Sequence, residues 1–146
     1  MIEKLAVAMF SIGVMTGVAH GGFIPLVHAS PGTQNVTTES RAVRCMVSST
    51  NVVCQRNSVE GFPDNPIIDG SRSNIASVTA TGALKRSGGN IPGAYENDPR
   101  FDLVLTYGQT FSFYGWTISP SFGGTRFTND QTGHGMFVSI DGVSQF

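Results

Sequence analysis

Apolar and polar residues alternate most clearly between residues 42 and 56. Val43, Cys45 and Val47 fall on one side of an extended chain, and a second β-branched run ends at Cys54. A polar stretch of serine, threonine and asparagine separates the two runs. This pattern predicts a β-hairpin with a loop at residues 48–51.

The spacing of the two runs predicts the register of this hairpin. Antiparallel partners have a constant sum of residue numbers. That sum is 99 for Val47 with Val52, and it is again 99 for the two cysteines. Cys45 and Cys54 are therefore expected to lie directly opposite each other, with Cβ atoms about 4.5–5.5 Å apart, close to the separation in a disulfide.

Residues 57–100 have a different composition, rich in proline, glycine, asparagine and aspartate. Residues 74–86 contain one short β-branched run that predicts a strand, and the rest is expected to form irregular loops. Because loops on a rigid scaffold often carry function, Asp64 and Asp69 are candidate ligand-binding residues in this region.

Aromatic residues concentrate in the last third of the chain, where ten of the twelve that follow position 29 lie from Phe101 onward. Alternation predicts further strands at residues 101–107, 110–118, 124–130 and 135–141. No helical periodicity follows residue 29. The predicted fold class is all-β, a small antiparallel sandwich or barrel-like domain of hairpins.

The first residues have the layout of a secretory signal peptide. Lys4 is the basic residue of a short n-region, and residues 5–19 form an apolar run. We expect cleavage after Ala29, so that residues 1–29 are removed; cleavage after Ala19 is the alternative. A retained membrane anchor is less favoured, because the run is shorter than the roughly 20 apolar residues that span a bilayer.

The predicted destination is the extracellular space or the cell envelope, with no stable membrane span after signal cleavage. Residues 30–40 are polar and turn-forming, so we expect a flexible lead there. Residues 41–146 are then a single β domain, with the irregular middle loops at residues 57–100.

The net charge and the number of cysteines limit which partners and metal sites can be expected for this protein. The 9 Lys and Arg residues face 10 Asp and Glu residues, and the net charge is −1. Proteins that bind nucleic acid or an anionic membrane usually carry an excess of positive charge. The near-zero net charge therefore argues against both as partners. In an oxidising compartment a close cysteine pair favours a disulfide. A zinc site would need two further ligands, and signal cleavage leaves one histidine, so no metal or cofactor is expected.

The cysteine spacing recurs nearer the C-terminal end. Ile118 and Phe127 are separated by the same number of residues as the two cysteines. Their residue numbers sum to 245, as do those of Pro120 and Thr125. We expect a second hairpin with a four-residue loop there, closed by an apolar cross-strand pair in place of sulfur.

Two stretches carry a family resemblance, RCMVSSTNVVCQR at residues 44–56 and a C-terminal stretch that contains LTYG and TGHGMF. They resemble an uncharacterised family of small secreted actinobacterial, chiefly mycobacterial, proteins with paired-cysteine hairpins and a C-terminal T/S-G-H-G-F/M-F motif. The matching positions are Leu105, Tyr107, Gly108, Asn129 and residues 132–137. Ile118 and Phe127 stand where the family has its second cysteine pair. The resemblance implies two similar hairpins and secretion, and it implies no activity.

His134 lies between two glycines, with Asp130 and Asp141 on either side. A small secreted hydrolase would use His134 as a base, oriented by Asp130 or Asp141, beside a serine nucleophile. No G-x-S-x-G motif is present, and the flanking glycines are typical of a turn in which an imidazole hydrogen-bonds to the main chain. We therefore favour a structural role for His134.

Tyr114 and Trp116 are expected on one side of a strand that places Phe111 and Phe113 on the other. One side belongs to the core, and the other, if exposed, would offer Tyr114 and Trp116 as a platform for carbohydrate or lipid. The predicted function is a non-enzymatic binding domain for an unidentified protein or envelope component. The hydrolase is the alternative.

Overall fold

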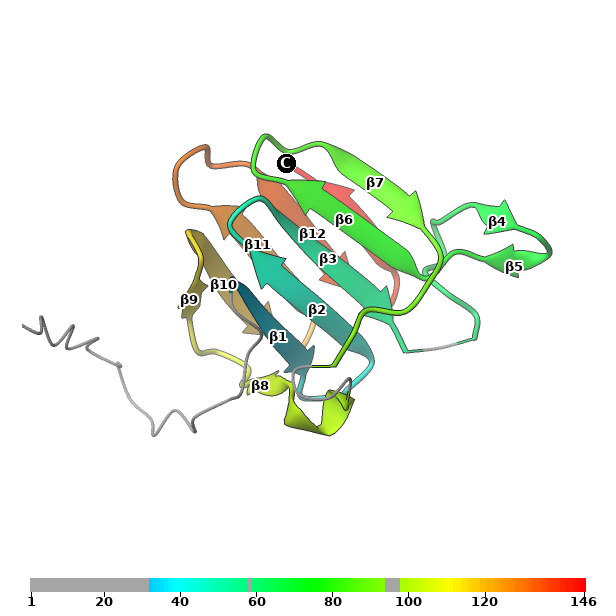
Figure 1. The fold of residues 1–146 in the computed structure, drawn as a ribbon, viewed down its shortest axis with the longest axis horizontal. Coiled ribbons are helices and arrows are strands. Elements are labelled where there is room, and N and C mark those ends of the chain that lie inside the picture. Colours follow the sequence, from blue (N-terminus) through cyan, green and yellow to red (C-terminus); the bar gives the residue numbers. More distant parts are fainter. Residues whose placement is uncertain (1–31, 58, 94–97) are drawn as a thin grey trace, which may run out of the picture.

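Two β-sheets pack face to face as a sandwich in a computed structural model that describes residues 32–57, 59–93 and 98–146 (Figure 1). The predicted signal peptide and both cleavage positions lie outside these described residues. The all-β class predicted from the alternation is confirmed, and of the two architectures expected, the chain adopts the sandwich.

The first sheet has six strands in the order β7-β6-β3-β2-β1-β8. These strands are β1 (Thr33–Thr38), β2 (Val43–Ser48), β3 (Asn51–Arg56), β6 (Ile75–Thr79), β7 (Leu84–Ser87) and β8 (Leu103–Leu105). Neighbouring strands are antiparallel except β1 and β8, which are parallel. A parallel neighbour requires a long crossover connection. The chain reaches β8 through the 3-10 helix η1 (Pro99–Phe101).

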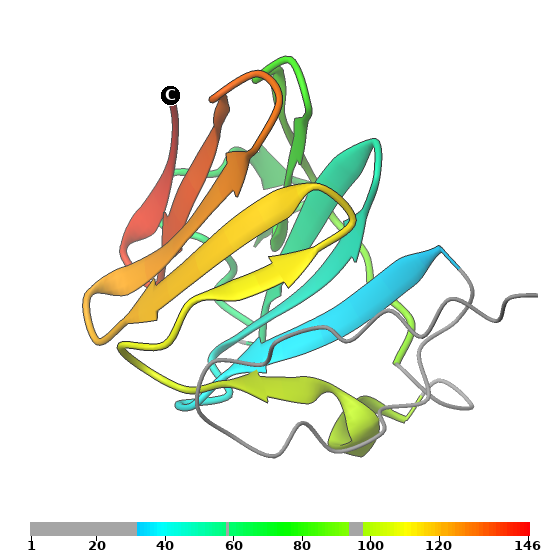
Figure 2. The ribbon, with the colours of Figure 1, turned by 90° about the vertical axis from the view of Figure 1, so that its left-hand side faces the viewer.

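The second sheet has five antiparallel strands in the order β13-β12-β11-β10-β9. They are β9 (Phe111–Phe113), β10 (Trp116–Ser121), β11 (Gly124–Asn129), β12 (Gly135–Ser139) and β13 (Gly142–Gln145). Figure 2 shows them side by side, from β9 in yellow to β13 in red. The region predicted as irregular contains the expected strand β6, and also β7 and a small hairpin of β4 (Ile67–Ile68) and β5 (Ser71–Arg72) that extends from the sandwich.

The core lies between the two sheets. It is formed by the side chains on one side of the strands, as expected because side chains alternate between the two sides of a strand. The first sheet contributes Val36, Val43, Cys45, Val47, Val52, Cys54, Ala76, Val78 and Leu105. The second contributes Trp116, Ile118, Phe127, Met136, Val138 and Val143. Trp116 also joins the two sheets, because its Nε1–H donates to the main-chain oxygen of Ser48 at 2.9 Å.

Both predicted hairpin registers are confirmed. Cys45 lies opposite Cys54 with 4.0 Å between the Cα atoms, and the two form a disulfide inside the core. Ile118 lies opposite Phe127 on the other sheet. In the first hairpin Val47 and Val52 are the last pair, which confirms the four-residue loop at 48–51; Ser48 and Asn51 pair instead with β1 and β6. In the second hairpin the pairing continues to Ser121 and Gly124, which leaves a two-residue turn at 122–123 rather than a four-residue loop.

The prediction of a flexible lead is wrong for residues 33–38, which form strand β1 between β2 and β8. Val36 enters the core with Gln34 on the same side of the strand, while Asn35 and Thr37 are buried on the other side. Polar composition misled here because the partner of Asn35 comes from a distant part of the chain. The amide of Asn35 donates to the main-chain oxygen of Pro92 at 2.6 Å, which compensates its burial.

Candidate functional site

His134 lies in the turn between β11 and β12 with its side chain exposed. Its Nδ1 is 3.2 Å from the main-chain oxygen of Phe146, and its own main-chain oxygen accepts the N–H of Asn129 at 2.7 Å. The imidazole packs on Gly82, where an added Cβ would lie 3.0 Å from the His134 Cβ. These contacts fit the structural role that the flanking glycines suggested.

The two carboxylates considered as orienting groups for His134 do not form hydrogen bonds with it among the described residues. Asp130 Oδ1 accepts the hydroxyl of Thr117 at 2.5 Å. Asp141 follows the five-residue strand β12, whereas His134 precedes it. At about 3.3 Å per residue, the strand separates them by roughly 17 Å. The arrangement that a hydrolase would need is therefore not assembled around His134 by either residue.

Tyr114 and Trp116 do not share one side of a strand, and the platform predicted from them is wrong. Tyr114 and Gly115 both have positive φ, 50° and 82°, and form a tight turn between β9 and β10. Trp116 is fully buried in the core, so no ligand can contact it. Tyr114 is 43% exposed at the turn.

Asp64 and Asp69, the candidate binding residues from the middle loops, have different surroundings. Asp64 Oδ2 accepts Arg86 Nη2 at 2.9 Å and the main-chain N–H of Val143 at 3.0 Å, so this carboxylate ties a loop to β13. Asp69 occupies the exposed turn between β4 and β5. The structure does not bring the two together as one binding site.

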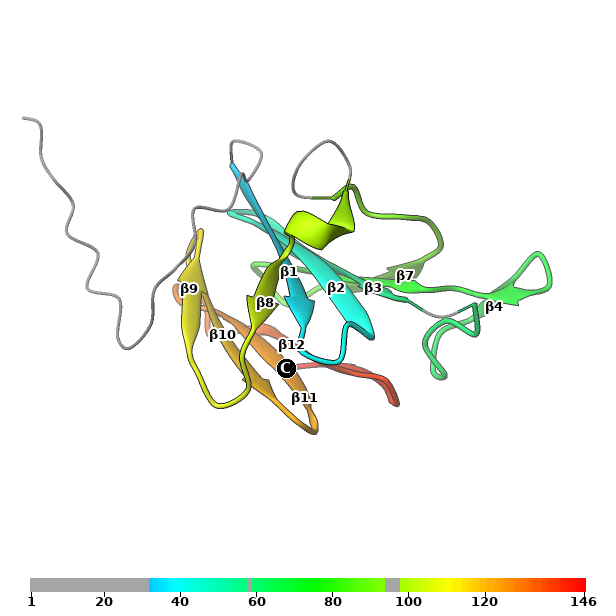
Figure 3. The same cartoon turned by 90° about the horizontal axis from the view of Figure 1, so that it is seen from below.

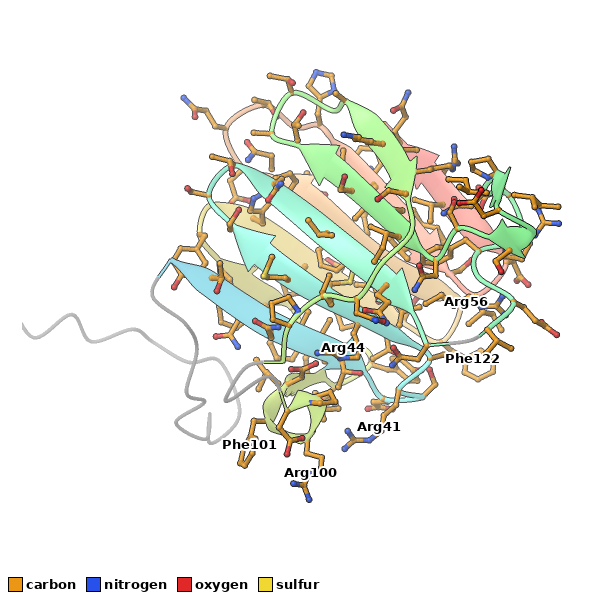
Figure 4. The ribbon with its side chains drawn as sticks, turned by 45° about the vertical axis from the view of Figure 1, so that its right-hand side comes forward. Arg41, Arg44, Arg56, Arg100, Phe101 and Phe122 are labelled. Atoms are coloured by element: carbon orange, nitrogen blue, oxygen red, sulfur yellow. A yellow bond between two sulfur atoms is a disulfide. The ribbon has the colours of Figure 1, made fainter. Side chains whose placement is uncertain are left out.

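A cleft that sequence reasoning missed opens on the outer side of the first sheet, beside the β1–β2 turn. Its volume is ≈ 360 Å³. The residues that line it are Thr37, Arg41, Arg44, Gln55, Asn57, Pro99 and Arg100. Three of these seven are arginines, and Figure 4 shows them at the lower edge of the molecule.

The strand register determines which side chains form the floor of this cleft, the part that lies on the sheet. Val43 and Cys45 point into the core, so Arg44 between them points outward from β2. Thr37 on β1 and Gln55 on β3 are its cross-strand partners. One row of three polar side chains therefore crosses the middle of the sheet.

Arg44 is held rigidly in this row. Its Nε is 2.6 Å from Asp102 Oδ2, and the side chains are only 9% and 0% exposed. Its two terminal nitrogens donate to the main-chain oxygens of Ile91 and Pro92, each at 3.3 Å. The charge of this arginine is thus compensated, and its geometry is fixed before any ligand arrives.

Arg100 forms an exposed pair with Asp98 across one wall of the cleft. The closest N–O distance is 2.6 Å, and the arginine side chain is 83% exposed. Hydrogen bonds from the Arg100 side chain hold the pKa of Asp98 below its ordinary value of 3.8. The same pairing raises the pKa of Arg100. Because water screens an exposed pair, Asp98 holds this guanidinium only weakly.

Arg41 differs from the other two arginines. Its backbone is fixed in the β1–β2 turn with φ 57°, where its N–H donates to Thr38 at 2.9 Å and its main-chain oxygen accepts the Asn57 amide at 2.8 Å. Its guanidinium group forms no ion pair or hydrogen bond with the residues that the structure describes. Of the three arginines that line the cleft, Arg41 is thus the one whose guanidinium has no partner within the described ranges.

The arginines that line this cleft have side chains that can bind an anion. A guanidinium group presents a planar fork of N–H donors that matches the oxygens of a carboxylate or a phosphate. The amide groups of Gln55 and Asn57 are already used, by Asn90 and Ile91 and by Arg41 respectively. Across the described ranges, no group of three or more His, Cys, Asp and Glu side chains is placed to hold a metal ion.

Comparison with known proteins adds no assignment. The chain matches no protein-family model, no curated protein and no solved structure. In the described part of the chain no helix is long and apolar enough to cross a membrane.

Proposed function

We propose that this protein is a secreted, non-enzymatic binding domain that takes an anionic group, a carboxylate or a phosphate, in the cleft between Arg41 and Arg100. The observation that carries the proposal is the guanidinium of Arg41, which has no partner among the described residues and lies at the edge of a cleft lined by two further arginines. Secretion is supported by the disulfide between Cys45 and Cys54, since such bonds persist in oxidising compartments.

The charges around the cleft favour an anion with a single negative charge. Among the described ion pairs, Arg44 is paired with Asp102 and Arg100 with Asp98, whereas Arg41 has no carboxylate partner. Arg44, whose nitrogens are bonded to Asp102, Ile91 and Pro92, gives the cleft a fixed floor that a ligand does not have to order. Arg41 then supplies the charge, and Arg100 can turn from Asp98 toward the ligand.

The side chains that line the cleft support binding rather than catalysis. None of the seven is a histidine, cysteine, aspartate or glutamate, the residue types that most often act as acid, base or nucleophile. The hydrolase alternative depends on His134, whose Nδ1 hydrogen-bonds to the main chain and which neither Asp130 nor Asp141 orients.

Titration with inorganic phosphate, followed by amide chemical shifts at constant ionic strength, tests the proposal. We expect saturable shifts for the amides near Arg41 and Asn57. Arg41→Gln should raise the dissociation constant at least tenfold. Lys85→Gln is the matched control, because it removes one positive charge from an exposed position on β7 and should leave binding unchanged. Equal shifts in Arg41→Gln and wild type would refute the assignment of the cleft.

A further inference from the structure

Two exposed phenylalanines and four arginines lie at one end of the sandwich. The end is formed by the β1–β2 turn, the end of β3, η1 and the β10–β11 turn, and Figure 3 shows it from below. In Figure 4, Arg41, Arg44 and Arg100 lie between Phe122 on one side and Phe101 on the other, and Arg56 lies on the same side as Phe122. Hydrogen bonds connect the turns: the N–H of Tyr107 donates to Glu39 at 3.1 Å.

Phe122 is the most unusual of these residues. It occupies the two-residue turn between β10 and β11 and is 94% exposed. The Tyr107 ring contacts it edge to face, with 6.4 Å between centroids. The N–H of Gly108 donates to Pro120 at 3.0 Å, so the neighbouring loop is bonded to the same hairpin. The phenyl ring is therefore presented to solvent by a firmly bonded support.

From this arrangement we infer that this end of the sandwich docks on an anionic lipid surface, with Phe122 entering the interface and a lipid phosphate in the Arg41 cleft. The inference rests on the proposed function, because it names the source of the anion. Phe122 and Phe101 are separate projections, which suits a soft interface into which amphipathic groups sink about 5–10 Å. A protein partner would need a continuous complementary area of about 800 Å² on each side.

The positive charges that would attract lipid phosphates are those of individual arginines and not of the whole end of the sandwich. Arg41 and Arg56 form no ion pair with a carboxylate of the described residues, and Arg100 holds only its exposed partner Asp98. Glu39 and Glu60 lie on the neighbouring turns, so the end as a whole carries no large positive potential. The guanidinium groups of Arg41 and Arg100 would therefore each contact one lipid phosphate, whereas Arg56 already donates to the main-chain oxygen of Gly61. Aromatic rings placed beside such groups are typical of residues that anchor proteins at membrane interfaces.

Co-sedimentation with vesicles tests the inference on the full protein with its disulfide intact. One set of vesicles contains phosphatidylglycerol mixed with phosphatidylcholine, and the other contains phosphatidylcholine alone. We expect binding to the first set and at least tenfold weaker binding to the second. Phe122→Ser and Arg41→Gln should each lower the partition coefficient about tenfold. A tenfold loss corresponds to about 1.4 kcal/mol.

Two controls make the outcomes distinguishable. Tyr114→Asn removes a 43% exposed aromatic side chain at the opposite end of β10 and should leave vesicle binding unchanged. Phe122→Ser should keep the phosphate-induced shifts near Arg41, which shows that the variant is folded. If neither vesicle binds while phosphate still shifts these amides, the lipid inference fails and the proposed function stands.

Two further results would overturn the inference. Unchanged vesicle binding by Phe122→Ser would show that the ring does not enter the interface. A concentration-dependent dimer of the wild type that Phe122→Ser abolishes would show that a second copy of the chain covers the ring.

Discussion

Arg44→Met tests whether the buried pair beneath the cleft holds the domain together. Methionine keeps most of the apolar stem of arginine and removes the guanidinium group. Asp102, whose side chain is 0% exposed, then loses the partner 2.6 Å away. The main-chain oxygens of Ile91 and Pro92 lose a donor at the same time.

The expected cost follows from desolvation. Removing one partner of a buried ion pair destabilises a protein by about 3–5 kcal/mol, because the remaining charge stays buried. Domains of this size have a total stability of about 5–15 kcal/mol. Arg44→Met should therefore lose a large share of the free energy of unfolding. With a urea m-value of about 2 kcal/mol per molar, the midpoint should fall by roughly 2 M.

Urea unfolding followed by tryptophan fluorescence measures this loss, since Trp116 is the single tryptophan and is fully buried. Arg100→Met is the matched control. It breaks an ion pair whose arginine side chain is 83% exposed, and it should leave the unfolding midpoint unchanged. A loss below about 1 kcal/mol for Arg44→Met, the scale of an exposed pair, would refute the reasoning that this pair is desolvated.

Two other predictions concern the disulfide and the exposed pair. Joint Cys45→Ala and Cys54→Ala substitution should cost about 2.7 kcal/mol of unfolding free energy in urea from loop entropy alone, whereas reactive thiols in the wild type would contradict the bond. Titration by NMR should place the pKa of Asp98 below 3.8, and Arg100→Met should return it toward 3.8. The pair's stabilisation should therefore be present above pH 3.8 and disappear as the pH falls through the lowered pKa; a pKa that does not move in Arg100→Met would refute the pairing.

The hairpin registers could be predicted because strand pairing is local there. Alternation in steps of two and the constant sum of residue numbers were enough to place Cys45 opposite Cys54 and Ile118 opposite Phe127. The loop of the second hairpin is shorter than predicted, because Ser121 still pairs with Gly124 although serine and glycine are typical of a loop. Polar side chains at strand ends do not distinguish a loop from an exposed strand position.

The remaining errors arise where distant segments decide the outcome. Asn35 is buried because Pro92 supplies an acceptor, and nothing near Asn35 in the sequence indicates that bond. The alternation of side chains predicts Trp116 on the same side of one strand as Tyr114, because the alternating pattern continues through a turn. That turn requires a positive φ at Tyr114, which the sequence pattern does not indicate. Arg41 and Arg44 line the cleft together with Arg100, which follows them in the sequence by 59 and 56 residues.

The parallel pairing of β1 with β8 has a consequence for the order of folding. Val36 pairs with Leu103, whereas the partners in the disulfide hairpin are 9 residues apart. Contacts between distant residues carry a large loop-closure entropy and form slowly compared with local hairpins. We therefore expect the hairpins to form first and the edge between β1 and β8 to close last. The arginine cleft, which spans β1, β2, β3 and η1, would be completed in that final step, so only the fully folded chain would bind its ligand.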